Sequence, residues 1–186
     1  MSHRLHGSLA AAPGFRLQCS RPHRLFIRST AIQIRECNFH DVEAISHLVI
    51  QSATEHIGPT LSEAGMSRLI EAMSISSQRE RIDGEYKYWV AIDDNEYLGT
   101  AAIKLPNHLY YLFVKTECHG QGIGKALLQA VCTHVMQTSE AKCMSVNSSL
   151  NSVAFYSRRG FVVNGPIKNE HEILFQPMTK PLLRQH

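Results

Sequence analysis

Apolar residues follow two different periods along the chain. They alternate with polar residues in AIQIREC at 31–37, and they recur every three or four positions at Val42, Ile45, Val49 and Ala53. Alternation is typical of half-buried strands, and the longer period is typical of a helix with one buried face. These periods predict further strands at 86–92, 97–105, 143–147, 161–163 and 172–175, and further helices at 62–73, 123–135 and 151–159.

One more strand is predicted at residues 108–114, HLYYLFV, which has no polar face. A strand that is apolar on both faces is typical of the middle of a sheet. Turn residues at 93–95 predict a hairpin just before this central strand. Gly160 predicts the end of a helix, and Gly165-Pro166 predict a turn between the last two strands. A glycine-rich loop and a long helix follow the central strand directly.

Some buried and capping positions can also be named. Asn38 and Asp41 precede the first helix and offer side-chain oxygens as caps. In the second helix, we expect Leu69, Ile70 and Met73 on the buried side.

The length and composition predict one soluble domain. Of the 186 residues, 44% are hydrophobic, which suffices for a substantial core. No apolar run approaches the ~20 residues that cross a bilayer, so we expect no membrane partner. The expected organisation is a poorly ordered basic extension at 1–30, one domain at 31–179 and a tail at 180–186.

The positive charge is concentrated at the N-terminus. Residues 1–30 hold five arginines and no acidic residue, so 14 of the 19 basic residues remain in the rest of the chain, against 16 acidic ones. The expected domain is therefore not basic, which argues against a nucleic-acid surface on it. We expect a cytoplasmic protein, although an Arg-rich leader also suits organelle import or a nucleic-acid tether.

The cysteines and histidines show no metal-ligand spacing. The five cysteines are scattered without a CxxC pair, and the eleven histidines include no HExxH. We predict free thiols and no metal site.

The loop HGQGIGK, residues 119–125, stands between the central strand and an amphipathic helix. Glycines at 120, 122 and 124 leave successive amides open to an anion at the positive end of the helix, and Lys125 adds charge. The loop fits neither GxxxxGK[ST] nor GxGxxG. A glycine turn that binds nothing is the alternative for the loop taken alone.

Two blocks together resemble the GNAT family of N-acetyltransferases. Residues 112–128, LFVKTECHGQGIGKALL, resemble its acetyl-CoA signature, in which Arg or Gln, two residues, Gly, one residue and Gly or Ala follow one another. Gly122 and Gly124 match, and His119 takes the Arg or Gln position. Residues 146–161, VNSSLNSVAFYSRRGF, resemble the later segment that ends in FYxxxGF. The resemblance covers about residues 31–179.

This resemblance implies an α/β fold, in which a central mixed sheet with splayed strands is flanked by about four helices. It implies acetyl-CoA as co-substrate, with the pyrophosphate on the loop and the pantetheine arm along the strand that ends at Phe113 and Val114. An amide near Val114 would hold the thioester oxygen. Asn147 and Asn151 would bond the pantetheine or cap the following helix. The implied donor-binding residues are Phe113, Val114, His119, Gly120, Gln121, Gly122, Ile123, Gly124, Lys125, Asn147 and Asn151.

Tyr156 is the expected general acid, because its match in the family points at the sulfur and a phenol can protonate the departing thiolate. A packed core aromatic is the alternative. His108 is the first candidate for the base that deprotonates the amine, and Glu117 is the second. Cys118 has no His or Asp partner placed by the sequence, so direct transfer is preferred to a covalent route.

The expected function is therefore transfer of an acetyl group from acetyl-CoA to a primary amine of a small molecule or peptide in a ternary complex. A CoA-binding sensor without catalysis is the alternative. The sequence leaves a homodimer open.

Overall fold

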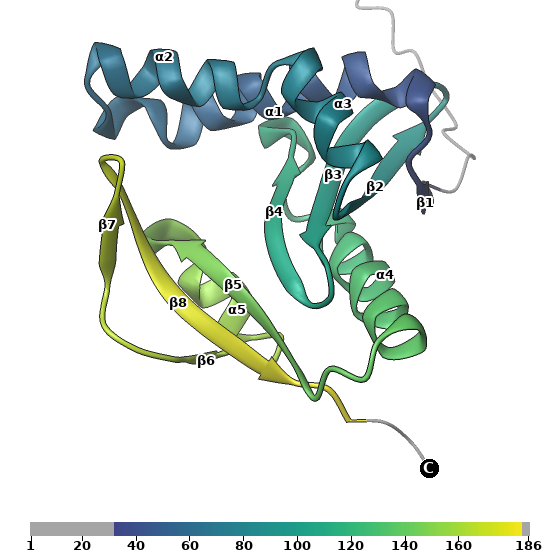
Figure 1. Ribbon diagram of the computed structural model, residues 1–186. Coiled ribbons are helices and arrows are strands. Elements are labelled where there is room, and N and C mark those ends of the chain that lie inside the picture. The colour runs from purple at the N-terminus through teal and green to yellow at the C-terminus, as the bar shows by residue number, and fades with distance from the viewer. Residues whose placement is uncertain (1–31, 184–186) are drawn as a thin grey trace, which may run out of the picture.

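The computed structural model describes residues 32–183, which form a mixed sheet with helices on both faces (Figure 1). The extension at 1–30 lies outside the described residues. The strands are β1 Gln33–Glu36, β2 Tyr86–Asp93, β3 Glu96–Lys104, β4 His108–Val114, β5 Cys143–Ser149, β6 Val162–Val163, β7 Lys168–Glu170 and β8 Ile173–Pro181. The helices are α1 Val42–His56, α2 Glu63–Ala72, α3 Ile75–Asp83, α4 Ile123–Thr138 and α5 Val153–Ser157.

The strands lie in the order β1-β2-β3-β4-β5-β8-β6, and β7 pairs with β8 beside this path. All neighbours are antiparallel except β4 and β5, which are parallel. The apolar strand β4 is the middle of the sheet, as its composition predicts. The mixed α/β architecture is also confirmed, with five α-helices in the described chain where about four are expected.

Two cores form on opposite faces of β2, β3 and β4. On one face, Val49 of α1 packs in a cluster with Val90 and Tyr111. On the other face, Leu127 of α4 packs in a cluster with Ala101, and this core continues under β5, β8 and α5. Alternate residues of one strand therefore pack against different helices, and β4 is held in place from both faces of the sheet.

The structure differs from the sequence prediction at three places. Helix α3 is not predicted, because its polar sequence ISSQRERID shows no apolar period. Ile70 is 42% exposed, so its placement on the buried side of α2 is wrong, although Leu69 and Met73 are buried. The expected final strand at 172–175 is longer, and Gly165-Pro166 leads into the additional short strand β7.

The turn between β7 and β8 contacts α2. His171 and Glu172 form this turn with φ of 53° and 72°. The Glu172 carboxylate accepts hydrogen bonds from the Ser62 amide at 2.8 Å, the Ser62 hydroxyl at 2.9 Å and Arg68 Nη2 at 2.8 Å. These bonds lower the pKa of Glu172, with the Ser62 amide as the first cause. Figure 1 shows the hairpin pointing toward the start of α2.

A buried carboxylate joins β1 to the start of α1. Asp41, whose side chain is 2% exposed, accepts two hydrogen bonds from Arg35 at 2.7 Å each. It also accepts from the Asn38 amide and the Tyr97 hydroxyl. Asn38 and Asp41 form a capping box on the short 3-10 turn before α1, whereas α1 itself, with Asp41 as its N-cap, has no side-chain cap bond, so the expected cap falls one turn earlier. Although burial opposes it, hydrogen bonding by Arg35, Asn38 and Tyr97 lowers the pKa of Asp41.

Candidate active site

The centre of the sheet opens where β4 and β5 part. Within the described chain the two strands pair at two successive positions, beginning with His108 and Ser145, and then diverge (Figure 1). A β-bulge falls at this point, because the register of β4 against β3 skips Tyr110. A bulge increases the local twist of a strand. The bulge at Tyr110 therefore accompanies the departure of β4 from β5.

The parted edge of β4 presents unpaired backbone groups. The amide of Lys115 donates to the carbonyl of Leu98 in β3 at 2.9 Å. By the alternation of an antiparallel ladder, the backbone groups of Leu112 and Val114 then point away from β3 and toward the gap. The carbonyl of Val114 accepts a hydrogen bond from His119 Nε2 at 2.9 Å. The Val114 amide thus faces the side on which the thioester oxygen is expected, whereas Phe113 uses its backbone in the ladder with β3.

A buried amide side chain holds β4 from the other face. Gln78 of α3 is completely buried, and its Oε1 accepts from the hydroxyls of Tyr88 at 2.9 Å and Tyr111 at 3.2 Å. Burial raises the pKa of Tyr88 to about 12, so this phenol stays a neutral donor. Because Tyr111 directly follows the bulge, Gln78 helps to set the course of β4 beyond it. The sequence analysis does not identify Gln78, since a lone polar residue carries no pattern.

The glycine loop has an open concave side. Gly120 and Gly122 have φ of 79° and 85°, and nothing lies within 4 Å of the position that a Cβ would take at either residue. The amides of residues 120–125 donate to no backbone carbonyl within the described residues, and α4 begins at Ile123. Unpaired amides at a helix N-terminus favour an anion. The loop therefore offers an open, positively polarised surface to an anion.

The other residues of the loop have different surroundings. A Cβ at Gly124 would meet the ring of Phe155 at 3.3 Å and Leu112 at 3.5 Å, so close packing of α5 against α4 requires this glycine. Lys125 is exposed. His119 turns back to Val114 and stacks on His56, with ring centroids 5.7 Å apart.

Tyr156 lies in α5 with its ring packed edge-on against Phe155 and Phe161. The residue is 5% exposed, and burial raises its pKa, while the nearby charge of Arg159 opposes this effect. Within residues 32–183, Nε of Arg159 is the only fully buried side-chain nitrogen or oxygen without a hydrogen-bond partner. The Tyr156 hydroxyl also has no hydrogen-bond partner among these residues. Because it is not one of the fully buried atoms, part of its surface is exposed. A protonated phenol with a free hydroxyl can donate a proton to a nearby sulfur.

His108 lies at the closed end of the gap, where β4 and β5 still pair. Its Nδ1 is 2.8 Å from the hydroxyl of Ser145. Burial, and secondarily the charge of Lys104, lower the pKa of His108 below 6.5. The imidazole is therefore neutral near pH 7, the state in which it can accept a proton.

The remaining candidates lie on β5 and in the loops. Asn147 on β5 and Asn151 just before α5 are both exposed. Glu117 is exposed in the short turn before the glycine loop, and Cys118 is buried there. The four cysteines within the described residues are free thiols. Residues 32–183 contain no group of three His, Cys, Asp or Glu side chains that could hold a metal ion. No helix in this part of the chain is long and apolar enough to span a membrane.

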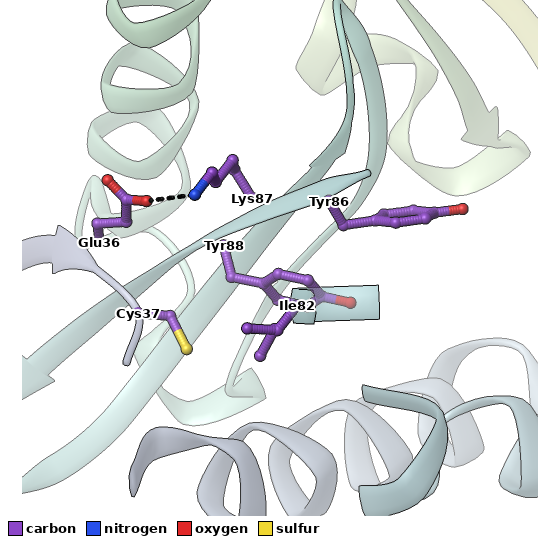
Figure 2. Close-up of a pocket in the computed structure, with 6 residues that line it drawn as sticks. All are labelled: Glu36, Cys37, Ile82, Tyr86, Lys87 and Tyr88. Atoms are coloured by element: carbon purple, nitrogen blue, oxygen red, sulfur yellow. Dashed lines mark ion pairs between the residues drawn. The ribbon is translucent and has the colours of Figure 1, made fainter. Parts of the chain in front are cut away.

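A separate hollow lies between β1, β2 and α3 (Figure 2). Lys87 and Glu36 form an ion pair of 3.5 Å at its side. The hollow also contains Cys37, whose pKa is raised to about 12, chiefly by burial. A thiol that stays protonated is a poor nucleophile. None of the predicted site residues lines this hollow, which is completed by Ile82, Tyr86 and Tyr88.

The sheet parts between two parallel central strands and a glycine loop follows the first of them, which is the arrangement that the resemblance to the GNAT family implies. A family model described as an acetyltransferase (GNAT) domain matches residues 57–182. The chain therefore belongs to the GNAT family of acetyltransferases.

Several relatives show how far this similarity extends. The chain is 31% identical over 100 residues to the peptidyl-lysine N-acetyltransferase YjaB of Salmonella typhimurium, a match that covers 53% of this chain and 63% of that relative. Among solved structures, a GCN5-related N-acetyltransferase from Rhodopseudomonas palustris has a TM-score of 0.71 at 20% identity, covering 82% of this chain and 97% of that one. The PaiA N-acetyltransferase of Thermoplasma acidophilum, crystallised with coenzyme A, has a TM-score of 0.69 at 20% identity, covering 82% and 99%. These structural matches establish a shared fold.

Proposed function

We propose that this chain is an acetyl-CoA-dependent N-acetyltransferase that transfers the acetyl group directly to a primary amine of a small molecule or peptide. The observation that carries this proposal is the open side of the glycine loop next to the unpaired edge of β4. The loop amides would bind the pyrophosphate, and the edge of β4 would pair with the amide-containing arm of the donor.

In the proposed reaction, the amine nitrogen attacks the thioester carbonyl carbon and the carbon–sulfur bond breaks. His108 takes the proton of the charged amine before attack, because its lowered pKa keeps it neutral, and the nitrogen loses its second proton to solvent when the carbon–sulfur bond breaks. Tyr156 gives one proton to the departing sulfur, and exchange with solvent restores both groups. The Val114 amide would stabilise the oxygen as negative charge develops on it.

We propose a broader class of acceptor for this chain than peptidyl-lysine, which is the substrate in the name of the YjaB relative. An alkylamine with a pKa near ~10 is mostly charged at neutral pH and needs a base before attack. We therefore propose that a lysine-like aminoalkyl chain, free or within a peptide, is the first class to test.

The test is release of free CoA thiol from acetyl-CoA across amino acids, polyamines, aminoglycosides and lysine peptides. We expect amine-dependent release, and Tyr156→Phe should lower kcat by about 10²- to 10⁴-fold while CoA binding persists. Tyr97→Phe is the matched control, because it removes a hydroxyl that bonds Asp41 outside the proposed machinery. It should lower the melting temperature and leave kcat unchanged.

Two results would count against this proposal in different ways. Saturable CoA binding without amine-dependent thiol release would favour the sensor alternative. Unchanged kcat in Tyr156→Phe would remove this residue from the mechanism and leave the transferase assignment in place.

A further inference from the structure

Arg159 is a partly buried cation without a counter-ion. It forms no ion pair with an acidic side chain within residues 32–183, and its Nε is fully buried without a hydrogen-bond partner. Its Nη1 donates to the Phe155 carbonyl at 2.8 Å, and Nη2 has no partner in the same part of the chain. Nε is covered by the protein itself, so Nη2 is the guanidinium nitrogen left to bond a further partner.

The position of Arg159 indicates where that partner binds. Its guanidinium carbon lies 3.6 Å from the centroid of the Phe155 ring. The same ring comes within 3.3 Å of the Cβ position of Gly124, in the first turn of α4. Phe155 thus contacts both the guanidinium and the helix end that carries the unpaired amides of residues 120–125.

The electrostatics indicate an anion. Burial and the charge of neighbouring Arg158 lower the pKa of Arg159, and a bound anion would offset both effects. A guanidinium binds phosphate oxygens through a planar fork of N–H donors. The positive charge of Arg159 acts to lower the pKa of Tyr156, so the two side chains lie close together.

We propose that Arg159 binds the pyrophosphate of the acyl-CoA donor together with the amides of residues 120–125, an inference that rests on the proposed function. It accounts for the surroundings of His119, which takes the Arg or Gln position of the signature but turns its side chain to the Val114 carbonyl. The cation at the phosphates comes instead from the turn that follows α5, on the opposite side of the gap.

The test is calorimetric titration of the full chain with CoA, 3′-dephospho-CoA and pantetheine. Arg159→Met keeps an unbranched stem on Phe155 and removes the charge, Arg159→Lys keeps the charge without the fork, and Arg158→Met changes the exposed neighbour. We expect Arg159→Met to weaken CoA and 3′-dephospho-CoA by about 10- to 100-fold. Its pantetheine affinity should stay within about twofold of the wild type, as should every affinity of Arg158→Met. Arg159→Lys should show a smaller loss for CoA.

Several outcomes would overturn the assignment. CoA affinity unchanged in Arg159→Met would show that this residue does not touch the donor. An equal loss for pantetheine would show that Arg159 acts by shaping Phe155, and a loss confined to CoA would move the contact to the 3′-phosphate. If Arg159→Met fails to fold, Arg159→Lys decides by the same comparison of CoA with pantetheine. No CoA binding by the wild type would instead refute the proposed function itself.

Discussion

The substitution Gly122→Ala tests the glycine loop most directly. Gly122 has a φ of 85°, and nothing lies within 4 Å of the position of an added Cβ. The substitution therefore strains the backbone without a clash in the unliganded protein. A left-handed backbone costs a residue with a side chain about 1–2 kcal/mol. For a domain of this size, that corresponds to a melting temperature lowered by roughly 2–8 °C.

The effect on CoA binding should exceed this strain, because the new methyl group occupies the open side of the loop. A hydrogen bond to a charged group contributes about 1.5–3 kcal/mol, so loss of one amide–phosphate bond raises Kd by about 10- to 150-fold. CoA should consequently raise the melting temperature of the wild type much more than that of the variant, since a bound ligand stabilises by mass action.

The assay combines calorimetric titration of CoA with thermal melting, with and without CoA. Gly165→Ala is the matched control, because Gly165 has a φ of 119°, also has nothing within 4 Å of its Cβ position, and lies outside the proposed site. It should lower stability and leave Kd unchanged. If Gly122→Ala loses stability but binds CoA as the wild type does, the loop does not hold the phosphates.

Three further predictions concern titratable groups. Asp41→Asn should cost about 1–3 kcal/mol, because it removes the charged acceptor of Arg35, whose own side chain is 31% exposed. Since the pKa of Asp41 is lowered in the fold, its contribution is complete above its ordinary value of 3.8 and is lost in more acidic solution, so the difference in unfolding free energy between wild type and variant should shrink in acid. If His108 is the base, kcat/KM should decline in acid, and only at a pH below that at which a free imidazole titrates, because the pKa of His108 is lowered. His108→Gln should abolish this decline, and a profile that the substitution leaves unchanged would exclude the role. Glu172→Gln should speed hydrogen exchange of the β7 amides several-fold, because it weakens the bonds to Ser62 and Arg68, whereas Glu170→Gln on the same hairpin should not. Equal exchange rates in both variants would show that the contact with α2 does not hold the hairpin.

The main elements of the fold could be predicted because their buried faces are apolar. The period at Val42, Ile45, Val49 and Ala53 matches α1, and these four side chains are buried. Helix α3 could not be found in this way, since its completely buried residue is Gln78, which is satisfied by tyrosines of two strands. The contacts that stabilise such a helix come from residues distant in the sequence.

In the candidate site too, some residues could be predicted from the sequence and others could not. The need for glycine at 120 and 122 could be predicted, because a left-handed backbone and an open anion site both exclude side chains. Arg159 could not be singled out, although it follows Phe155 by four positions, the spacing at which helical side chains meet. Its meaning depends on the contact between Phe155 and Gly124, which joins two helices that no local pattern connects.

The two-position pairing of β4 with β5 has a consequence for how the molecule fluctuates. Central strands are normally the slowest to exchange their amide hydrogens, because their ladders open only in large cooperative units. Here the line between β4 and β5, in the middle of the sheet, is paired at two positions within residues 32–183, so the amides of Leu112 and Val114 should exchange faster than those of β3 next to them. A molecule that bonds to this line would make the ladder continuous and couple the two halves of the protein into one cooperative unit.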